Sequence, residues 1–215
     1  GKEYDNIYPV WDWTRIPGTT AIGNQDKTSL EGYQIGNNEF GGGVSDGVNG
    51  IIAYKGKYNE LQANKAYFFF DNMMFCIGSD ISYVQNDNVL TSVEQNLLNG
   101  EVIYNDGQEK QLSSNSNMQL KQLKWVYHNN TGYIFRGTDN VTIQNMSQAG
   151  SWKDINATGE SGLIDKNVFS VWINHGLNPE NASYQYIVVP DKSINAFRDL
   201  AEQIDFYIAQ NDGSV

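Results

Sequence analysis

Cysteine, histidine, basic residues and long apolar runs are scarce in this chain of 215 residues. Its one cysteine, Cys76, cannot form an intrachain disulfide, and one thiol cannot build a Cys-based metal site. Cys76 stands in an apolar stretch, MMFCI at residues 73–77, so we interpret it as a buried small apolar residue rather than a reactive thiol. The longest apolar run is far shorter than the roughly 18 residues of a transmembrane helix, so we expect no membrane span.

Basic residues are outnumbered, because 14 Lys and Arg face 25 Asp and Glu and give a formal net charge of −11. A nucleic-acid-binding protein needs a basic footprint, and none is visible. No polybasic stretch suits an anionic membrane. An acidic domain also repels an acidic polysaccharide, so a site for such a ligand would be a local exception or would lie on another domain.

Aromatic residues and glycine are plentiful instead. The chain has 13 Tyr, 9 Phe, 5 Trp and 21 Gly, which favours strands separated by many turns. Two apolar segments flank Asp71-Asn72, a pair typical of a two-residue hairpin turn. Short strands are expected at 51–54, 66–70, 73–77, 89–93, 101–104, 124–127, 133–135, 141–145, 168–173 and 184–189. This spacing predicts an all-β sandwich or barrel that occupies residues 1–215 as one domain.

Two segments depart from this strand pattern. Residues 36–50 are dense in glycine, which indicates a backbone that bends sharply or lies close to another backbone or a ligand. Near the C-terminus, apolar residues recur at three and four positions after a capping Asp191 or Ser193. We therefore predict a helix over about 193–208.

Four sequence blocks, taken in order, carry a family resemblance. They are WTRIPGTT at 13–20, FGGGVSDG at 40–47, ANKAYFFFDN at 63–72 with IGSDI at 77–81, and GSWKDIN at 150–156. Their order and spacing are similar to those of polysaccharide lyase family 8, which includes hyaluronate, chondroitin and xanthan lyases. The resemblance covers about residues 8–190.

The resemblance implies a central antiparallel super-sandwich that is related to mutarotase-like domains. It also implies an N-terminal α/α toroid, whose Asn, His, Tyr and Arg perform a β-elimination on an acidic, uronate-containing polysaccharide. This chain would then be a fragment of a larger enzyme, inactive alone, with the toroid and the glycan as partners. A bacterial, secreted or periplasmic location is expected, with a leader removed before Gly1.

The family's glycine-rich loop contributes a supporting carboxylate and amide to the cleft. In this chain the matching residues are Asn37, Asn38 and Glu39. Glu39 would orient a cleft residue, and the two amides would bond to sugar hydroxyls or to the uronate carboxylate. The family acid would align with Asn37 rather than Glu39, and an ordinary polar turn is the alternative interpretation.

An aromatic and cationic cluster precedes the Pro-Gly turn. Trp11 and Trp13 would stack on sugar rings, and Arg15 would pair with a carboxylate. The alternative is a structural plug that packs against the sandwich.

The β-elimination implied by the resemblance requires no cofactor, but the resemblance also implies a structural calcium ion. Its ligands would be Glu60 and Gln62 together with Asp71 and Asn72, since calcium prefers oxygen donors. A polar hairpin end is the alternative.

Only two histidines are present, His128 and His175, and no Gly-x-Ser-x-Gly motif accompanies them. We interpret His175 as a residue that fixes a loop by a hydrogen bond. The competing function for the whole chain is a non-catalytic carbohydrate-binding or scaffold module of similar fold.

Overall fold

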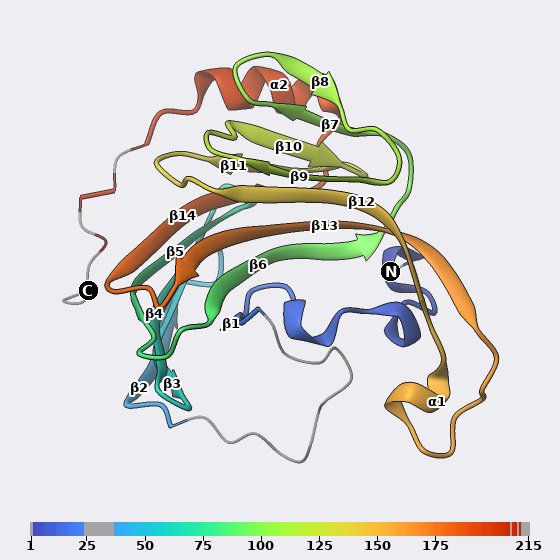
Figure 1. Cartoon of the computed structure of the whole chain (residues 1–215). Helices are drawn as coiled ribbons and strands as arrows, with labels where there is room; N and C mark the ends of the chain where they lie inside the picture. The colour runs from blue at the N-terminus through green and yellow to red at the C-terminus, as the bar shows by residue number, and fades with distance from the viewer. Residues whose placement is uncertain (1, 24–36, 207, 210, 212–215) are drawn as a thin grey trace.

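Two antiparallel β-sheets form the molecule, which confirms the all-β prediction. The computed structural model describes residues 2–23, 37–206, 208–209 and 211. Figure 1 shows the sheets stacked, with helix α2 (Ile194–Gln203) at one end and α1 (Trp152–Ile155) at the other. No helix in the described part of the chain is long and apolar enough to cross a membrane.

The larger sheet has nine strands and the smaller has five. In spatial order the larger contains β2 (Phe40–Ser45), β3 (Gly50–Tyr58), β4 (Leu61–Phe70), β5 (Met73–Ser82), β14 (Ala182–Val189), β11 (Thr131–Phe135), β10 (Trp125–His128), β7 (Val102–Asn105) and β8 (Glu109–Gln111). The smaller contains β1 (Thr20–Ile22), β6 (Asn88–Leu97), β13 (Ile164–Leu177), β12 (Val141–Gly150) and β9 (Ser116–Leu120). Each expected strand is present, whereas β1, β2, β8 and β9 had no strand signal in the sequence.

The main core fills the space between the sheets. Phe169 and Val171 of β13 belong to it, as do Tyr133 of β11 and Cys76 of β5, and all four are at most 1% exposed. Residues that alternate with these on β13 face the other way, because successive side chains of a strand point to opposite faces. The interpretation of Cys76 as a buried apolar residue is confirmed, and burial raises the pKa of its thiol to about 12.

The hairpin between β4 and β5 follows its turn chemistry. Asp71 and Asn72 have φ of 51° and 59°, and Phe70 pairs with Met73 across the turn. Two consecutive positive φ values define the type I′ geometry that suits the twist of flanking strands. The predicted hairpin is therefore confirmed.

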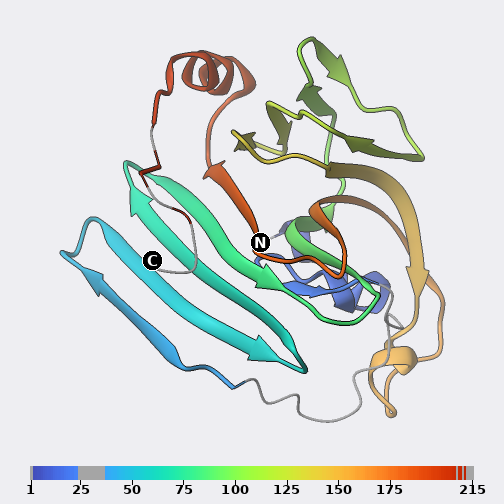
Figure 2. The same ribbon diagram turned by 60° about the vertical axis from the view of Figure 1, so that its left-hand side comes forward.

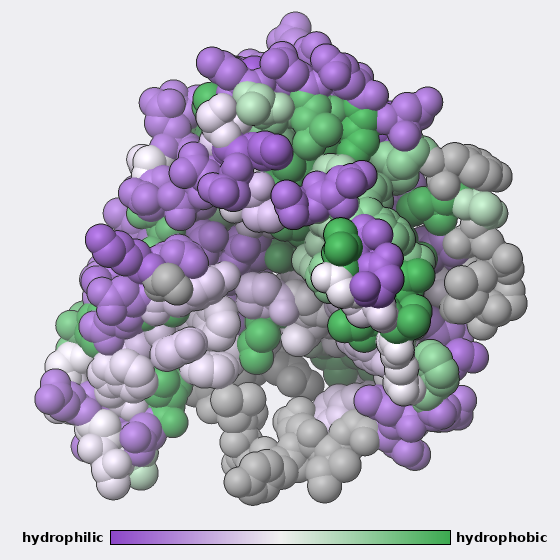
Figure 3. All heavy atoms as spheres, turned by 180° about the vertical axis from the view of Figure 1, so that it is seen from behind, coloured by the Kyte–Doolittle hydropathy of each residue, from purple (hydrophilic) through white to green (hydrophobic). Residues whose placement is uncertain are grey.

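The described part of the glycine-dense segment forms the edge strand β2 and its turn into β3. A Cβ atom added at Gly43 would stand 2.7 Å from the Ile51 carbonyl oxygen, so two backbones come close here, as expected. Gly47, with φ of 92°, lies in the turn. Every residue of β2 is exposed. Figure 2 shows β2 to β5 running side by side. Figure 3, which views the molecule from behind Figure 1, shows green apolar patches within the purple hydrophilic surface.

Helix α2 starts where the sequence predicts but ends earlier. The Ser193 side chain accepts a hydrogen bond from the Ala196 N–H at 3.4 Å and caps the helix. The prediction that it continues to 208 is wrong, because Ile204 already has extended backbone. Arg136 donates to the Ile204 carbonyl, and Phe206 packs edge-to-face on Phe75, so tertiary contacts draw the chain away from the helical path.

The N-terminal segment covers the face of the smaller sheet that is turned away from the main core. It forms three 3-10 turns: η1 (Lys2–Tyr4), η2 (Tyr8–Val10) and η3 (Trp13–Arg15). Ile7 and Val10 pack on Val168 of β13 in a separate apolar cluster. This packing fixes the segment that carries the predicted aromatic and cationic residues.

Candidate functional site

Four aromatic rings gather where the N-terminal segment meets α1. Trp11 and Trp13 lie 5.4 Å apart edge-to-face, and Tyr8 lies 5.5 and 5.9 Å from them. Trp152 adds an edge contact to Tyr8 at 6.5 Å. We call Tyr8, Trp11, Trp13 and Trp152 the aromatic platform. Tyr8 is 42% exposed and the three Trp are half-buried, so part of each ring remains open to a ligand.

Indole hydrogen bonds hold the platform in place. Trp11 Nε1 donates to the Gln95 carbonyl of β6, and Trp13 Nε1 donates to the Tyr8 carbonyl, both at 3.2 Å. Trp152 Nε1 donates to Asn6 Oδ1 at 3.0 Å. The rings are therefore anchored by their polar edges while part of their apolar surface remains accessible, an arrangement that suits stacking on sugar rings.

Arg15 lies next to the platform and stacks on a different aromatic ring, that of Trp172. Its guanidinium carbon is 3.9 Å from the centre of the Trp172 ring, and its Nε is 3.4 Å from Asp12 Oδ2. Asp12 also caps η3, because its Oδ1 accepts from the Thr14 N–H at 3.1 Å and hydroxyl at 2.6 Å. Burial lowers the pKa of Arg15, while Asp12 opposes that shift. An arginine remains charged in proteins, so Arg15 presents a fixed cation.

The buried amide of Gln95 ties this segment to the sheet. Its Oε1 accepts from the Asp12 N–H at 2.8 Å, and its Nε2 donates to the carbonyls of Asp12 at 3.0 Å and Arg15 at 3.1 Å. Gln95 is fully buried, so each of these bonds replaces one that water would otherwise make.

Sequence reasoning missed Asp12, Gln95 and Trp172. Asp12 had a local signal, since an acid directly before a short helix is a common cap. Gln95 and Trp172 had none, because they come from β6 and β13 and meet the segment only in the folded chain.

The Pro-Gly turn that follows Arg15 is fixed from the larger sheet. Gly18 has φ of 83°, which confirms the predicted turn geometry. Its carbonyl accepts from Lys65 Nζ at 2.6 Å and from the Tyr67 hydroxyl at 3.3 Å. Lys65 is 4% exposed, and burial lowers the pKa of its ammonium to about 7.

A cavity of about 200 Å³ continues from this turn, and it brings Asn38 beside Thr19, Thr20 and Lys65. Asn37 donates its backbone N–H to the Lys57 carbonyl at 2.8 Å. Glu39 is exposed and lies outside the cavity lining. Of the three loop residues, only Asn38 is brought to the cavity.

The four expected calcium ligands are not brought together. Glu60 and Gln62 stand at the start of β4, whereas Asp71 and Asn72 follow its end. Ten residues of strand separate the two pairs by about 33 Å, at roughly 3.3 Å per residue. One ion cannot be bound by all four, so the proposed ligand set is wrong. In residues 2–23 and 37–206, no group of three or more His, Cys, Asp or Glu is placed to hold a metal.

Both histidines are held by hydrogen bonds to other parts of the sandwich. His175 Nε2 hydrogen-bonds to Thr91 Oγ1 at 2.8 Å, so a hydrogen bond is present as predicted, but it joins strands β13 and β6 rather than fixing a loop. His128 Nε2 accepts from the Asn99 N–H at 2.9 Å. Burial lowers the pKa of each to about 4, so both are neutral near pH 7.

Comparison with protein families gives a match over residues 1–201 to polysaccharide lyase family 8, super-sandwich domain. Among curated proteins, the chain is 42% identical over 193 residues to chondroitinase-AC of Pedobacter heparinus, which covers 88% of this chain and 27% of that protein. It is 30% identical over 201 residues to xanthan lyase of Bacillus sp. strain GL1, which covers 88% and 22%. The chain thus spans about a quarter of the length of these relatives.

Solved structures agree with this family match. A chondroitinase AC lyase studied as oligosaccharide complexes superposes with a TM-score of 0.89 at 36% identity, covering 99% of this chain and 32% of that one. A Paenibacillus xanthan lyase superposes with a TM-score of 0.86 at 26% identity, covering 98% and 21%.

Proposed function

Since the chain belongs to polysaccharide lyase family 8, we propose that it forms one wall of the substrate cleft in a lyase that cleaves uronate-containing polysaccharide by β-elimination. The observation that carries the proposal is the fixed Arg15 cation on Trp172, beside the aromatic platform, in a chain of net charge −11. Arg15 is paired with Asp12, so it would serve an acidic glycan through charged hydrogen bonds from its guanidinium rather than through a local excess of positive charge.

The reaction explains why such a wall would be useful. A base removes the proton on C5 of the uronate, the bond from C4 to the bridging oxygen breaks, and an acid protonates that oxygen. The C5 proton becomes acidic only when the adjacent carboxylate is neutralised by cations or hydrogen bonds. Arg15 would contribute binding of a carboxylate or sulfate, and the platform would orient the sugar rings.

The proton-transfer groups are proposed to lie elsewhere in a longer protein, in a helical domain N-terminal to this chain. Both histidines are buried, hydrogen-bonded and of low pKa, which makes them poor bases for a bound sugar. A relative such as chondroitinase-AC is more than three times as long as the match. We further propose a secreted or periplasmic location, because a polysaccharide substrate is too large to enter the cytoplasm intact.

Titration of residues 1–215 with a chondroitin tetrasaccharide tests the binding role. The Arg15→Gln variant should bind at least about tenfold more weakly, since a hydrogen bond to a charged group contributes roughly 1.5–3 kcal/mol. Arg15→Lys, which keeps charge but loses planar stacking, should be intermediate. Lys121→Gln, an exposed cation outside the site, is the matched control.

Thermal unfolding of each variant separates lost binding from lost folding. Unchanged affinity in a folded Arg15→Gln protein would refute the site. The same chain should release no unsaturated product, followed by its ultraviolet absorbance, and sustained turnover would show that the catalytic groups lie within it. Binding without product by the longer protein would favour the non-catalytic module instead.

A further inference from the structure

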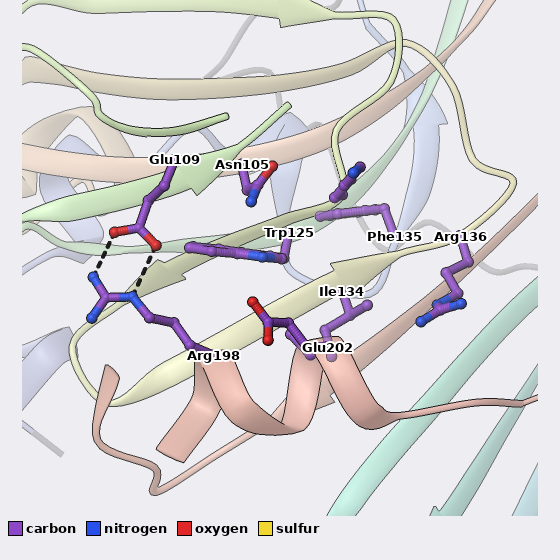
Figure 4. Close-up of a pocket in the computed structure, with 10 residues that line it drawn as sticks. Asn105, Glu109, Trp125, Ile134, Phe135, Arg136, Arg198 and Glu202 are labelled. Atoms are coloured by element: carbon purple, nitrogen blue, oxygen red, sulfur yellow. Dashed lines mark hydrogen bonds and ion pairs between the residues drawn. The ribbon is translucent and has the colours of Figure 1, made fainter. Parts of the chain in front are cut away.

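A second hollow, of about 440 Å³, opens between α2 and the end of the larger sheet. Trp125 and Ile134, which belong to the apolar cluster beneath α2, provide its apolar part. Figure 4 shows Arg198 and Glu202 rising from α2 towards Trp125, with Asn105 and Glu109 on the opposite side and Arg136 at the far end. None of these residues belongs to the platform.

The hollow exists because α2 packs tightly on the sheet at Phe197, whereas one turn later a small side chain, Ala201, faces the sheet. The Phe197 ring packs edge-to-face on Trp125 at 5.4 Å, and a Cβ atom at Gly132 would collide with it. Ala201, four residues on, lies on the same side of the helix and has only a methyl group to fill the space.

Cations outnumber carboxylates around the hollow. Arg198 is already bound to Glu109, with Nη2 to Oε1 at 2.5 Å and Nε to Oε2 at 2.8 Å. Arg136 donates one Nη2 bond to the Ile204 carbonyl at 2.7 Å. Within the described residues, neither Arg136 nor Lys124 has a carboxylate partner. Two cations are thus available to a ligand, against one unpaired carboxylate, Glu202.

We propose that this hollow binds one acidic sugar unit, as a site separate from the platform. Lys124 and Arg136 would pair with its carboxylate or sulfate, and Glu202 would accept hydrogen bonds from its hydroxyls. The volume lies within the range of about 300–1,000 Å³ that is typical of small-ligand sites. The class of ligand rests on the proposed function, and a second site would hold a long chain near the cleft by multivalency.

Two-dimensional NMR of the Trp125 indole N–H in residues 1–215 tests the site. A chondroitin tetrasaccharide should shift this resonance in a saturable way, and a neutral cellulose tetrasaccharide should not. Arg136→Gln should weaken the affinity measured from this shift at least about tenfold, by loss of a charged hydrogen bond. Ala201→Leu, which keeps high helix propensity but fills the hollow, should abolish it. Lys121→Gln, with the same charge change elsewhere, should leave it unaltered.

Several outcomes would overturn the inference: an unmoved Trp125 signal, an equal response to the neutral glycan, or full binding by a folded Ala201→Leu protein. The Arg15→Gln variant separates the two proposals. A Trp125 response that is unchanged in it, with platform resonances that saturate only at higher glycan concentration, supports two sites. Platform responses without Trp125 movement reject this site alone, and the reverse pattern rejects the platform alone.

Discussion

Residues 12–18 of the N-terminal segment and helix α2 are both short stretches laid on a sheet, but they are held by different kinds of contact. Upstream of this stretch, Ile7 and Val10 pack on Val168, but residues 12–18 themselves are held largely by buried polar bonds from Gln95 and Lys65. Helix α2 is held by a buried Phe197 ring pressed on Gly132. Hydrogen bonds are directional, so they fix the orientation of the backbone that carries Arg15. Apolar packing of Phe197 fixes where α2 lies on the sheet, and it leaves the polar side chains around the 440 Å³ hollow free to contact a ligand. The difference explains why the fixed cation, Arg15, belongs to the first region.

Phe197→Ala should have the largest effect of the changes that probe this contrast. Removal of a fully buried aromatic ring leaves a cavity and should lower the free energy of unfolding by about 3–5 kcal/mol. Urea denaturation measures it, with Phe40→Ala, a 53% exposed position on the edge strand, as the control expected to stay within about 0.5 kcal/mol. Equal losses in both would mean that α2 is not held by packing.

Gln95→Ala should act on the other region through hydrogen bonds. It leaves the Asp12 N–H and two carbonyls without their partner, and each buried unsatisfied group costs about 1–3 kcal/mol. We expect a loss of at least about 2 kcal/mol in urea, together with weaker saccharide binding at the platform. Gln119→Ala, at an exposed strand position, is the control. Unimpaired binding would show that Gln95 does not position Arg15.

Lys65 should make stability depend on pH. Its folded pKa of about 7 lies below the ordinary 10.5, so the native state binds fewer protons than the unfolded chain between these values. Stability therefore rises with pH through this window, by about 2 kcal/mol or less from about pH 7 to about pH 8.5. Below pH 7 the full burial penalty of the charged form remains.

Lys65→Met removes this titration and keeps an unbranched side chain that is one heavy atom shorter, so its pH slope should be smaller than that of the wild type. Neighbouring Cys76 and Tyr67 have pKa values raised by burial, which makes stability fall at higher pH in both proteins. The difference between the two curves isolates Lys65. Identical slopes would mean that its ammonium is not buried as described.

Local chemistry was enough to predict much of the fold. The β4–β5 hairpin follows from Asp71-Asn72, because these residues tolerate the positive φ of a type I′ turn. The start of α2 follows from Ser193, and the burial of Cys76 from its apolar neighbours. In the candidate site, Trp11, Trp13 and Arg15 were recognised because aromatic and cationic residues cluster within one short segment.

Only the tertiary structure decided which of these residues meet. Gln95 and Trp172 reach Arg15 from distant strands, and the expected calcium ligands are parted by the length of β4. Helix α2 stops at Gln203 because contacts of Ile204 and Phe206 outweigh local propensity. Sequence spacing encodes turns, caps and strand faces, since these depend on neighbours along the chain. Contacts between sheets depend on register and packing across the whole domain, and no local pattern records them.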